Sequence, residues 1–314
     1  MIQLTIGVTV LFVLSAAGNS DWSVAAPDPP SAKAQTALVR AFAAIEVGFD
    51  LQSGEEDLKK ASAELGRALD LLADSVDEAT AQRLTAVEAR DMSAKLVAIA
   101  WDRRRHPERY RELKAYDGRD PNLRDLPPLK KKHLTEAYRL AWEYCLLDPG
   151  TDDREYWKGG PPDPPAVEAL GKIRNDASIP TLVYYFRHVC RDDDKNDKFI
   201  FRQSWPLRVL TFYYPPSEKS LVALLECTSW KKRQWAKLGT SYYREEPPEE
   251  LIYSLVSGNG YSGYSSADWL KIMAAFPRER LPVEQRQWLE EALKRAERLR
   301  RPRPGGGQEP GLSP

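Results

Sequence analysis

Apolar side chains recur at helical spacing along most of the chain. Residues 36–50 place four of them on one helical face, and a second stretch after Ser53 repeats the pattern at three-, four- and seven-residue steps. These positions are Leu38, Phe42, Ile45 and Phe49, followed by Leu58, Leu65, Leu69, Leu72 and Val76. Ser53 and Glu56 have the spacing of a capping box, so we expect Ser53 to begin the second helix. The pattern predicts two helices.

Two further stretches have the same period. Residues 79–105 carry Leu84, Val87, Ala94, Ala98 and Trp101, and a helix from about 134 to 147 is expected to bury Leu134, Tyr138, Ala141 and Cys145. Residues 106–130 between them are polar and interrupted by prolines, which predicts a connector with room for one short helix. An antiparallel helical hairpin or small bundle over residues 36–147 is the expectation.

A glycine- and proline-rich stretch, residues 148–165, contains GGPPDPP and predicts a linker before a second domain at 166–298. That domain opens with ALGKIRNDASIPTLVYYF, where a helix ends in Leu-Gly-x-Ile and Ile-Pro-x-Leu opens the next. The segment resembles a HEAT-type helical repeat. We expect Asp176 or Ser178 to cap the second helix and Pro180 to lie in its first turn.

Later prolines support repetition. From Pro180, the prolines at 216, 248 and 282 follow at intervals of 36, 32 and 34 residues, and each precedes an apolar helical stretch. Stacked two-helix repeats have this period. The resemblance covers residues 164–296 at most, with one good unit, and an irregular helical domain explains the same pattern. An all-α fold, a helical hairpin or bundle followed by a HEAT-like α-solenoid segment, is predicted.

The two ends of the chain have a different composition. Residues 1–18 hold no charged side chain and end in small residues, which predicts a secretory signal peptide followed by a linker at 19–35. An uncleaved anchor or a buried N-terminal segment are the alternatives, because no basic residue precedes the apolar run. Residues 299–314 predict a disordered tail. We therefore expect an exported protein of the periplasm, cell envelope or extracellular space.

Charge and cysteine content narrow the function classes. Lys plus Arg and Asp plus Glu number 46 each, so no overall field favours nucleic acid, and no later stretch predicts stable membrane insertion. Three cysteines are too few for a disulfide scaffold. Cys190 and Cys227 could pair, whereas buried free thiols are the interpretation we favour.

No motif predicts a metal site, a cofactor or a catalytic centre. His188 and Cys190 precede Asp192, Asp193 and Asp194 without zinc-type spacing, and the loop from Asp192 lacks the glycine and glutamate of a calcium-binding EF-hand. Residues 258–263 match GxGxxG outside the strand–helix context that dinucleotide binding needs. We expect no metal and no cofactor.

Aromatic residues give the candidate binding positions, since more than half of them lie between Tyr184 and Trp269. Tyr261 and Tyr264 stand in a Ser/Gly-rich loop of a composition that binding loops use, and Trp230 precedes three basic residues. An ordinary connector and a solvated helix end are the simpler interpretations.

Two functions follow as hypotheses. The first is a non-enzymatic, exported helical-repeat protein that binds an unidentified protein partner as a scaffold. The second is an extracellular protein that binds or hydrolyses polysaccharide, with exposed aromatics and paired carboxylates at Glu245/Glu246 and Glu249/Glu250. The same glutamates could simply favour a helix start after Pro247 and Pro248.

Overall fold

The protein is all-α in the part of the chain that the structure describes, as the sequence predicts. The computed structural model describes residues 31–50, 52–86, 91–114, 131–151, 165–189, 205–238, 247–257 and 262–300. These ranges contain thirteen α-helices and no β-strand. Within them, no helix combines the length and apolar character that crossing a membrane requires. The predicted signal segment, the stretch 190–197 considered for metal and calcium binding, and residues 301–314 lie outside the described residues. Two predicted boundaries are wrong by a few residues, because the first described helix begins at Ala32 within the predicted linker 19–35 and the last described helix includes the first two residues of the predicted tail 299–314.

The first two helices form the predicted hairpin. Helices α1 (Ala32–Phe49) and α2 (Glu55–Ser75) pack against each other along their predicted apolar faces. The expected cap is wrong in detail, because Gly54 occupies the N-cap position and the Asp57 carboxylate accepts a hydrogen bond from its backbone N–H at 3.2 Å. Acidic side chains in the first turn of α2 add a favourable interaction with the helix dipole.

The next part of the chain contains more helices than its period indicates. The elements are α3 (Glu78–Ala86), α4 (Met92–Arg105), α5 (Pro107–Lys114), the 3₁₀ helix η1 (Lys131–Leu134) and α6 (Glu136–Leu147). The stretch predicted at 79–105 is thus two helices, and α5 is the short helix expected in the connector. Ala141 and Cys145 are buried as predicted, but Leu134 is exposed because it ends η1 instead of joining the apolar face of α6.

The segment that resembles a HEAT repeat forms a helix–turn–helix unit. Its helices are α8 (Pro165–Ile173) and α9 (Ile179–Val189), separated by the 3₁₀ helix η2 (Asp176–Ser178). Arg174 has a positive φ of 56°, which reverses the chain after α8. The cap observed in this turn belongs to η2, where the Asn175 side chain accepts a hydrogen bond from the backbone N–H of Ala177 at 2.9 Å. Ser178 directly precedes α9, but among the described residues its hydroxyl makes no capping hydrogen bond, so the expected cap of α9 is wrong in detail. Pro180 lies in the first turn of α9, as predicted.

Three of the remaining helices begin just after the repeated prolines. They are α11 (Trp205–Phe212), α12 (Glu218–Leu238), α13 (Glu250–Ser257), α14 (Ser266–Ala275), the 3₁₀ helix η4 (Arg278–Arg280) and α15 (Val283–Arg300). Pro216, Pro248 and Pro282 lie one or two residues before α12, α13 and α15 respectively. Proline suits these positions because it has no N–H to leave unpaired at a helix start.

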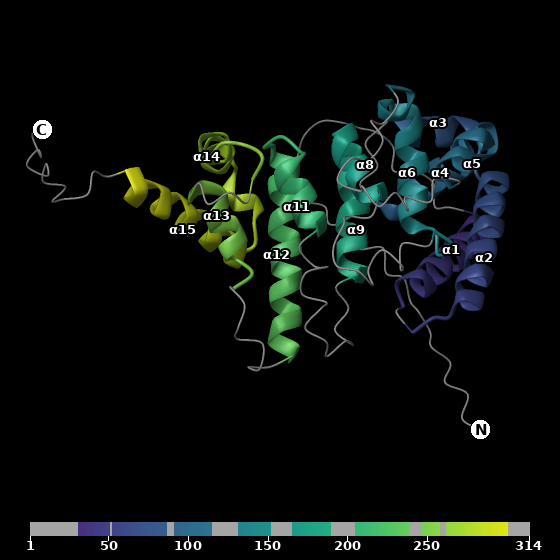
Figure 1. The fold of residues 1–314 in the computed structure, drawn as a ribbon, viewed down its shortest axis with the longest axis horizontal. Helices are drawn as coiled ribbons and strands as arrows, with labels where there is room; N and C mark the ends of the chain where they lie inside the picture. Colours follow the sequence, from purple (N-terminus) through teal and green to yellow (C-terminus); the bar gives the residue numbers. More distant parts are fainter. Residues whose placement is uncertain are drawn as a thin grey trace, which may run out of the picture.

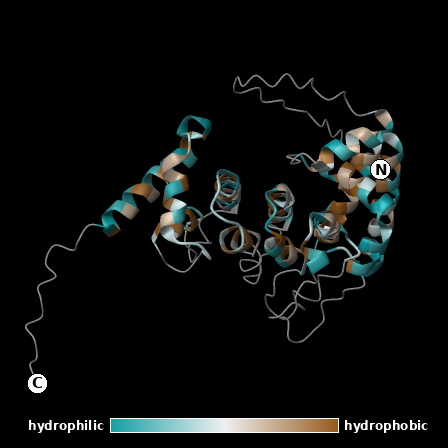
Figure 2. Cartoon of the chain, turned by 90° about the horizontal axis from the view of Figure 1, so that it is seen from above, coloured by the Kyte–Doolittle hydropathy of each residue, from teal (hydrophilic) through white to brown (hydrophobic). Residues whose placement is uncertain are grey.

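The helices follow one another along the long axis of the molecule in nearly the order of the sequence (Figure 1). In the middle of this row, α8 packs against α11, and α9 packs against α12. Two successive helix pairs therefore form two layers, one of α8 and α11 and one of α9 and α12. Seen from above, the row bends into an arc between its two ends (Figure 2).

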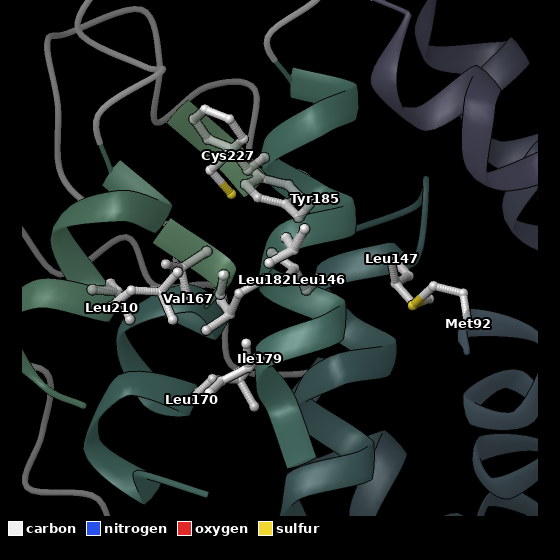
Figure 3. Packing of buried hydrophobic residues seen from close by; sticks show 14 of the residues in the cluster. Met92, Leu146, Leu147, Val167, Leu170, Ile179, Leu182, Tyr185, Leu210 and Cys227 are labelled. Carbon is white, nitrogen blue, oxygen red and sulfur yellow. The ribbon is translucent and has the colours of Figure 1, made fainter. Parts of the chain in front are cut away.

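Buried apolar side chains connect the first helices with the later ones. Met92 of α4 lies against Leu147 of α6, and Leu146 lies next to Leu182 of α9 (Figure 3). Helix α1 also reaches α9, where the Phe49 ring lies with its centroid 5.4 Å from that of Tyr185. The core therefore continues across the position of the predicted linker.

The start of that predicted linker packs closely on the first hairpin. A Cβ added to Gly48 of α1 would lie 3.0 Å from the Cα of Pro149, and one added to Gly150 would lie 2.6 Å from the Ser62 hydroxyl oxygen. A side chain at either glycine would therefore have to displace Pro149 or Ser62. Residues 152–164 lie outside the described residues, and the division of the chain into two domains stays a prediction.

Candidate functional site

The most unusual chemistry of the described residues is a buried charge cluster. The Lys95 ammonium nitrogen of α4 lies 2.9 and 2.8 Å from the Oε1 and Oε2 atoms of Glu143 in α6. The side chains of Lys95 and Glu143 are 1% and 0% exposed. The Lys95 ammonium also donates to the backbone carbonyl of Ala177 in η2.

Further donors complete the surroundings of the Glu143 carboxylate. Arg139, one turn earlier on α6, donates from Nη1 to Glu143 Oε1 at 2.6 Å, and the Thr181 hydroxyl of α9 donates to Oε2 at 2.9 Å. The Nε of Arg139 donates to Glu136 at 2.7 Å, and the side-chain amide of Asn175 donates to the same Glu136 carboxylate. The cluster thus joins α4, α6, η2 and α9.

This geometry stabilises the charged form of Glu143. Burial by itself raises the pKa of Glu143, but the Lys95 and Arg139 cations outweigh it and hold this pKa below its ordinary value. Both carboxylate oxygens are occupied by protein donors, and the carboxylate has no exposed surface. A group so enclosed positions helices and offers no atom to a substrate, so we assign the cluster a structural role.

A surface of different character lies where α9 meets α12. Between Lys219 and Ser229, helix α12 is buried except at Lys219, Val222 and Glu226, and residues 230–234 are all at least partly open to solvent. Open positions spaced three or four residues apart form a stripe along one side of the helix. The stripe consists of Lys219, Val222, Glu226, Trp230 and Arg233. On α9, the partly exposed residues Pro180, Tyr184 and Arg187 form a stripe of the same spacing, and the Tyr184 ring also packs against Phe42 and Phe49 of α1. We call these eight side chains the α9–α12 face.

Direct contacts join the two stripes of the α9–α12 face. Arg187 donates to Glu226 at 3.1 Å, and these side chains are 41% and 46% exposed. Trp230 is half-buried and packs edge-on against Phe186 of α9, with ring centroids 5.7 Å apart. The predicted binding residue Trp230 therefore belongs both to the interface between α9 and α12 and to the face that this interface presents.

The predicted Ser/Gly-rich loop has a local structural task. The Ser262 hydroxyl and the Gly263 N–H donate to the carbonyl of Thr211 at 3.0 and 3.2 Å, and the Tyr264 hydroxyl donates to the carbonyl of Tyr213 at 3.0 Å. These carbonyls lie at and just beyond the end of α11, where they have no partner within the helix. Tyr264 therefore holds the end of α11 in place, and its ring is half-buried. We call this contact the clamp on α11. Tyr261 lies outside the described residues.

One of the two predicted acidic pairs lies within the described residues. Glu249 and Glu250 lie at the start of α13, as the sequence indicates, whereas Glu245 and Glu246 lie outside the described residues. Glu249 accepts from Lys232 of α12 at 3.1 Å. Glu250 makes a bidentate pair with Arg295 of α15 at 2.8 and 3.1 Å. Both carboxylates connect α13 to neighbouring helices.

No group of three or more potential metal ligands occurs among the described residues. Cys145 and Cys227 are buried and form no disulfide with a described residue. Burial raises the pKa of Cys227 well above its ordinary value, which makes this thiol unreactive. Cys190 lies outside the described residues. Comparisons of the chain with protein-family models, curated proteins and solved structures found no match.

Sequence reasoning missed the buried cluster, although a signal was present. Lys95 lies three residues after Met92 and four before Ile99, on the apolar face of α4. Glu143 follows Arg139 by one turn, among the apolar residues of α6. Charged residues at core-facing positions of two helices indicate that they pair with each other.

Proposed function

We propose that the chain is a non-enzymatic, exported scaffold protein whose α9–α12 face binds a protein partner. The observation that carries the proposal is the pairing of α9 with α12, which brings together two stripes of charged and half-buried aromatic side chains. Aromatic and arginine side chains are enriched at protein interfaces, and aromatic rings supply a large contact area at a low cost in conformational entropy. The stacked helices beneath them supply that rigidity.

A HEAT-like repeat is part of the same proposal. The α8–η2–α9 unit, the repeated prolines at helix starts and the two layers formed with α11 and α12 support it. Repeats of this type stack into curved rows with extended binding surfaces. Export of the protein is proposed from the apolar, uncharged composition of its first eighteen residues alone.

The ion pairs of Glu249 and Glu250 favour the scaffold over polysaccharide hydrolysis. A hydrolase needs one carboxyl group that protonates a leaving group and another that acts as a base or nucleophile. Here each carboxylate is bound to a cation of a neighbouring helix, Lys232 or Arg295. These contacts give both glutamates a role in packing α13 against α12 and α15.

Affinity capture from an envelope extract tests the proposal. The wild-type chain is compared with Lys219→Glu/Arg233→Glu, which reverses two exposed charges on the α9–α12 face. A matched control, Lys60→Glu/Arg67→Glu, makes the same change on exposed positions of α2. We expect one specific partner to bind the wild type and the control but not the face variant. Equal capture by both variants, or no specific capture by the wild type, would contradict the proposal.

A further inference from the structure

Three helices that are distant in sequence meet at the Glu143 carboxylate. It accepts hydrogen bonds from Lys95 of α4, Arg139 of α6 and Thr181 of α9, at distances between 2.6 and 2.9 Å. Lys95 donates in addition to the carbonyl of Ala177 in η2. One buried anion is therefore the common acceptor for the first helices and for the unit that resembles a repeat.

The buried charges determine the relative orientation of the helices more than they stabilise the fold. Burying ions costs several kcal/mol each, and buried charge networks are often no more stabilising than apolar residues of equal volume. The apolar contacts around the cluster, such as Leu146 against Leu182, have no strong directional preference and tolerate sliding. A carboxylate with donors from several elements is satisfied in only one arrangement of those elements.

The arrangement extends from the cluster into the following helices. The Glu136 carboxylate accepts a hydrogen bond from Arg139 and another from the side-chain amide of Asn175, at the turn before η2. The Tyr214 hydroxyl, between α11 and α12, lies 3.2 Å from the carbonyl oxygens of both Leu170 and Asn175. The turn that starts α9 is therefore tied to α6 on one side and to the connection between α11 and α12 on the other.

We propose that Lys95, Arg139 and Glu143 form an orientation lock. The lock fixes the angle at which α8, α9 and the helices after them stand on α4 and α6, and it contributes little net stability. It would thereby set the curvature of the row of helices. The inference goes beyond the proposed function and does not depend on it, because it concerns the relative placement of helices with or without a partner.

Spin-label distance measurements test the lock. Labels are attached at Lys60→Cys on α2 and Lys271→Cys on α14, both exposed, in a background without the native cysteines. The lock is removed by Lys95→Met/Arg139→Met/Glu143→Leu, which keeps side-chain volume while removing the charges. The matched control, Met92→Leu/Leu146→Met/Leu182→Met, changes three apolar side chains at the same junction with little change of volume.

We expect the lock variant to keep its helical circular dichroism and a thermal midpoint within about 4 °C of its parent. Its distance distribution should become about twofold broader, while that of the control stays narrow. A lock variant with an unchanged distribution would overturn the proposal. So would a lock variant that unfolds or melts far below its parent while the control does not, because the cluster would then supply stability and not orientation.

Discussion

The Lys95 ammonium nitrogen lies 2.8 and 2.9 Å from the two carboxylate oxygens of Glu143, with both side chains excluded from solvent. Removing one partner leaves the other as an unpaired buried charge. We expect Lys95→Met and Glu143→Leu each to lower the free energy of unfolding by about 3–5 kcal/mol. The double variant should lose much less than the sum of the two. Urea denaturation of all four proteins gives the coupling, and additive losses would show that the pair is not coupled.

Gly263 has no room for a side chain. A Cβ at this position would lie 2.4 Å from the carbonyl oxygen of Phe212, whereas one at Gly54 would lie 3.6 Å from the Asp57 carboxylate. We expect Gly263→Ala to destabilise the protein by about 2–3 kcal/mol through overpacking and loss of the clamp on α11. Gly54→Ala is the control, with a change below about 1 kcal/mol. Thermal melts with equal losses in both variants would contradict this account of the loop.

Asn175 should not tolerate aspartate, although the two residues are usually equivalent as helix caps. Its side-chain oxygen caps η2, while its side-chain amide donates to the Glu136 carboxylate. Aspartate keeps the cap but places a second carboxylate against Glu136. We expect Asn175→Asp to cost about 1–2 kcal/mol and Asn175→Ser less. Chemical denaturation at neutral pH measures the free energy of unfolding of both variants. An Asn175→Asp variant as stable as the wild type would show that Asn175 does not interact with Glu136.

Acid should weaken the contact between α5 and η1. Hydrogen bonding by Lys132, supported by His133 and opposed by burial, lowers the pKa of Glu112 from 4.5 to about 2. A carboxyl group with a lowered pKa in the folded state stabilises that state above its unfolded pKa, and the stability is lost as the pH falls through the folded value. The loss therefore lies between about pH 4.5 and pH 2.

Glu112→Gln removes this titration. We expect the thermal midpoint of this variant to depend less steeply on pH than that of the wild type over the same window, with Glu297→Gln on the exposed surface of α15 as the control. Glu143 also has a lowered pKa and titrates against Lys95 and Arg139 in all three proteins, so only the difference between them reports Glu112. Parallel curves would contradict the assignment.

Much of the fold could be predicted from hydrophobic period and proline position. The apolar faces of α1 and α2 and the helix starts after Pro216, Pro248 and Pro282 follow from local rules of spacing and capping. Ser53 and Leu134 were misassigned because a cap or a break one or two residues away moves a side chain to another face. Such shifts depend on tertiary packing, which cannot be inferred from the spacing of hydrophobic residues.

The candidate site was predictable only in part. Trp230 was selected for its basic neighbours, yet its partner Phe186 and the alignment with Arg187 depend on the packing of α9 against α12. The loop of Tyr264 has the composition of a binding loop, but its donors satisfy the end of α11. Composition identifies groups able to make contacts, whereas the distances between helices decide which contacts form.

Cross-linking between α9 and α12 tests the central claim, that these helices lie side by side and present one face. In a background without native cysteines, the substitutions Arg187→Cys and Glu226→Cys replace two side chains that form an ion pair at 3.1 Å. The double variant is then treated with a short bismaleimide. We predict an intramolecular cross-link in high yield, found by mass spectrometry and lost in denaturant. The control pair Arg187→Cys/Glu297→Cys, on α9 and α15, should remain unlinked. Equal yields from the two pairs, or none from the first, would contradict the arrangement on which the proposed binding surface depends.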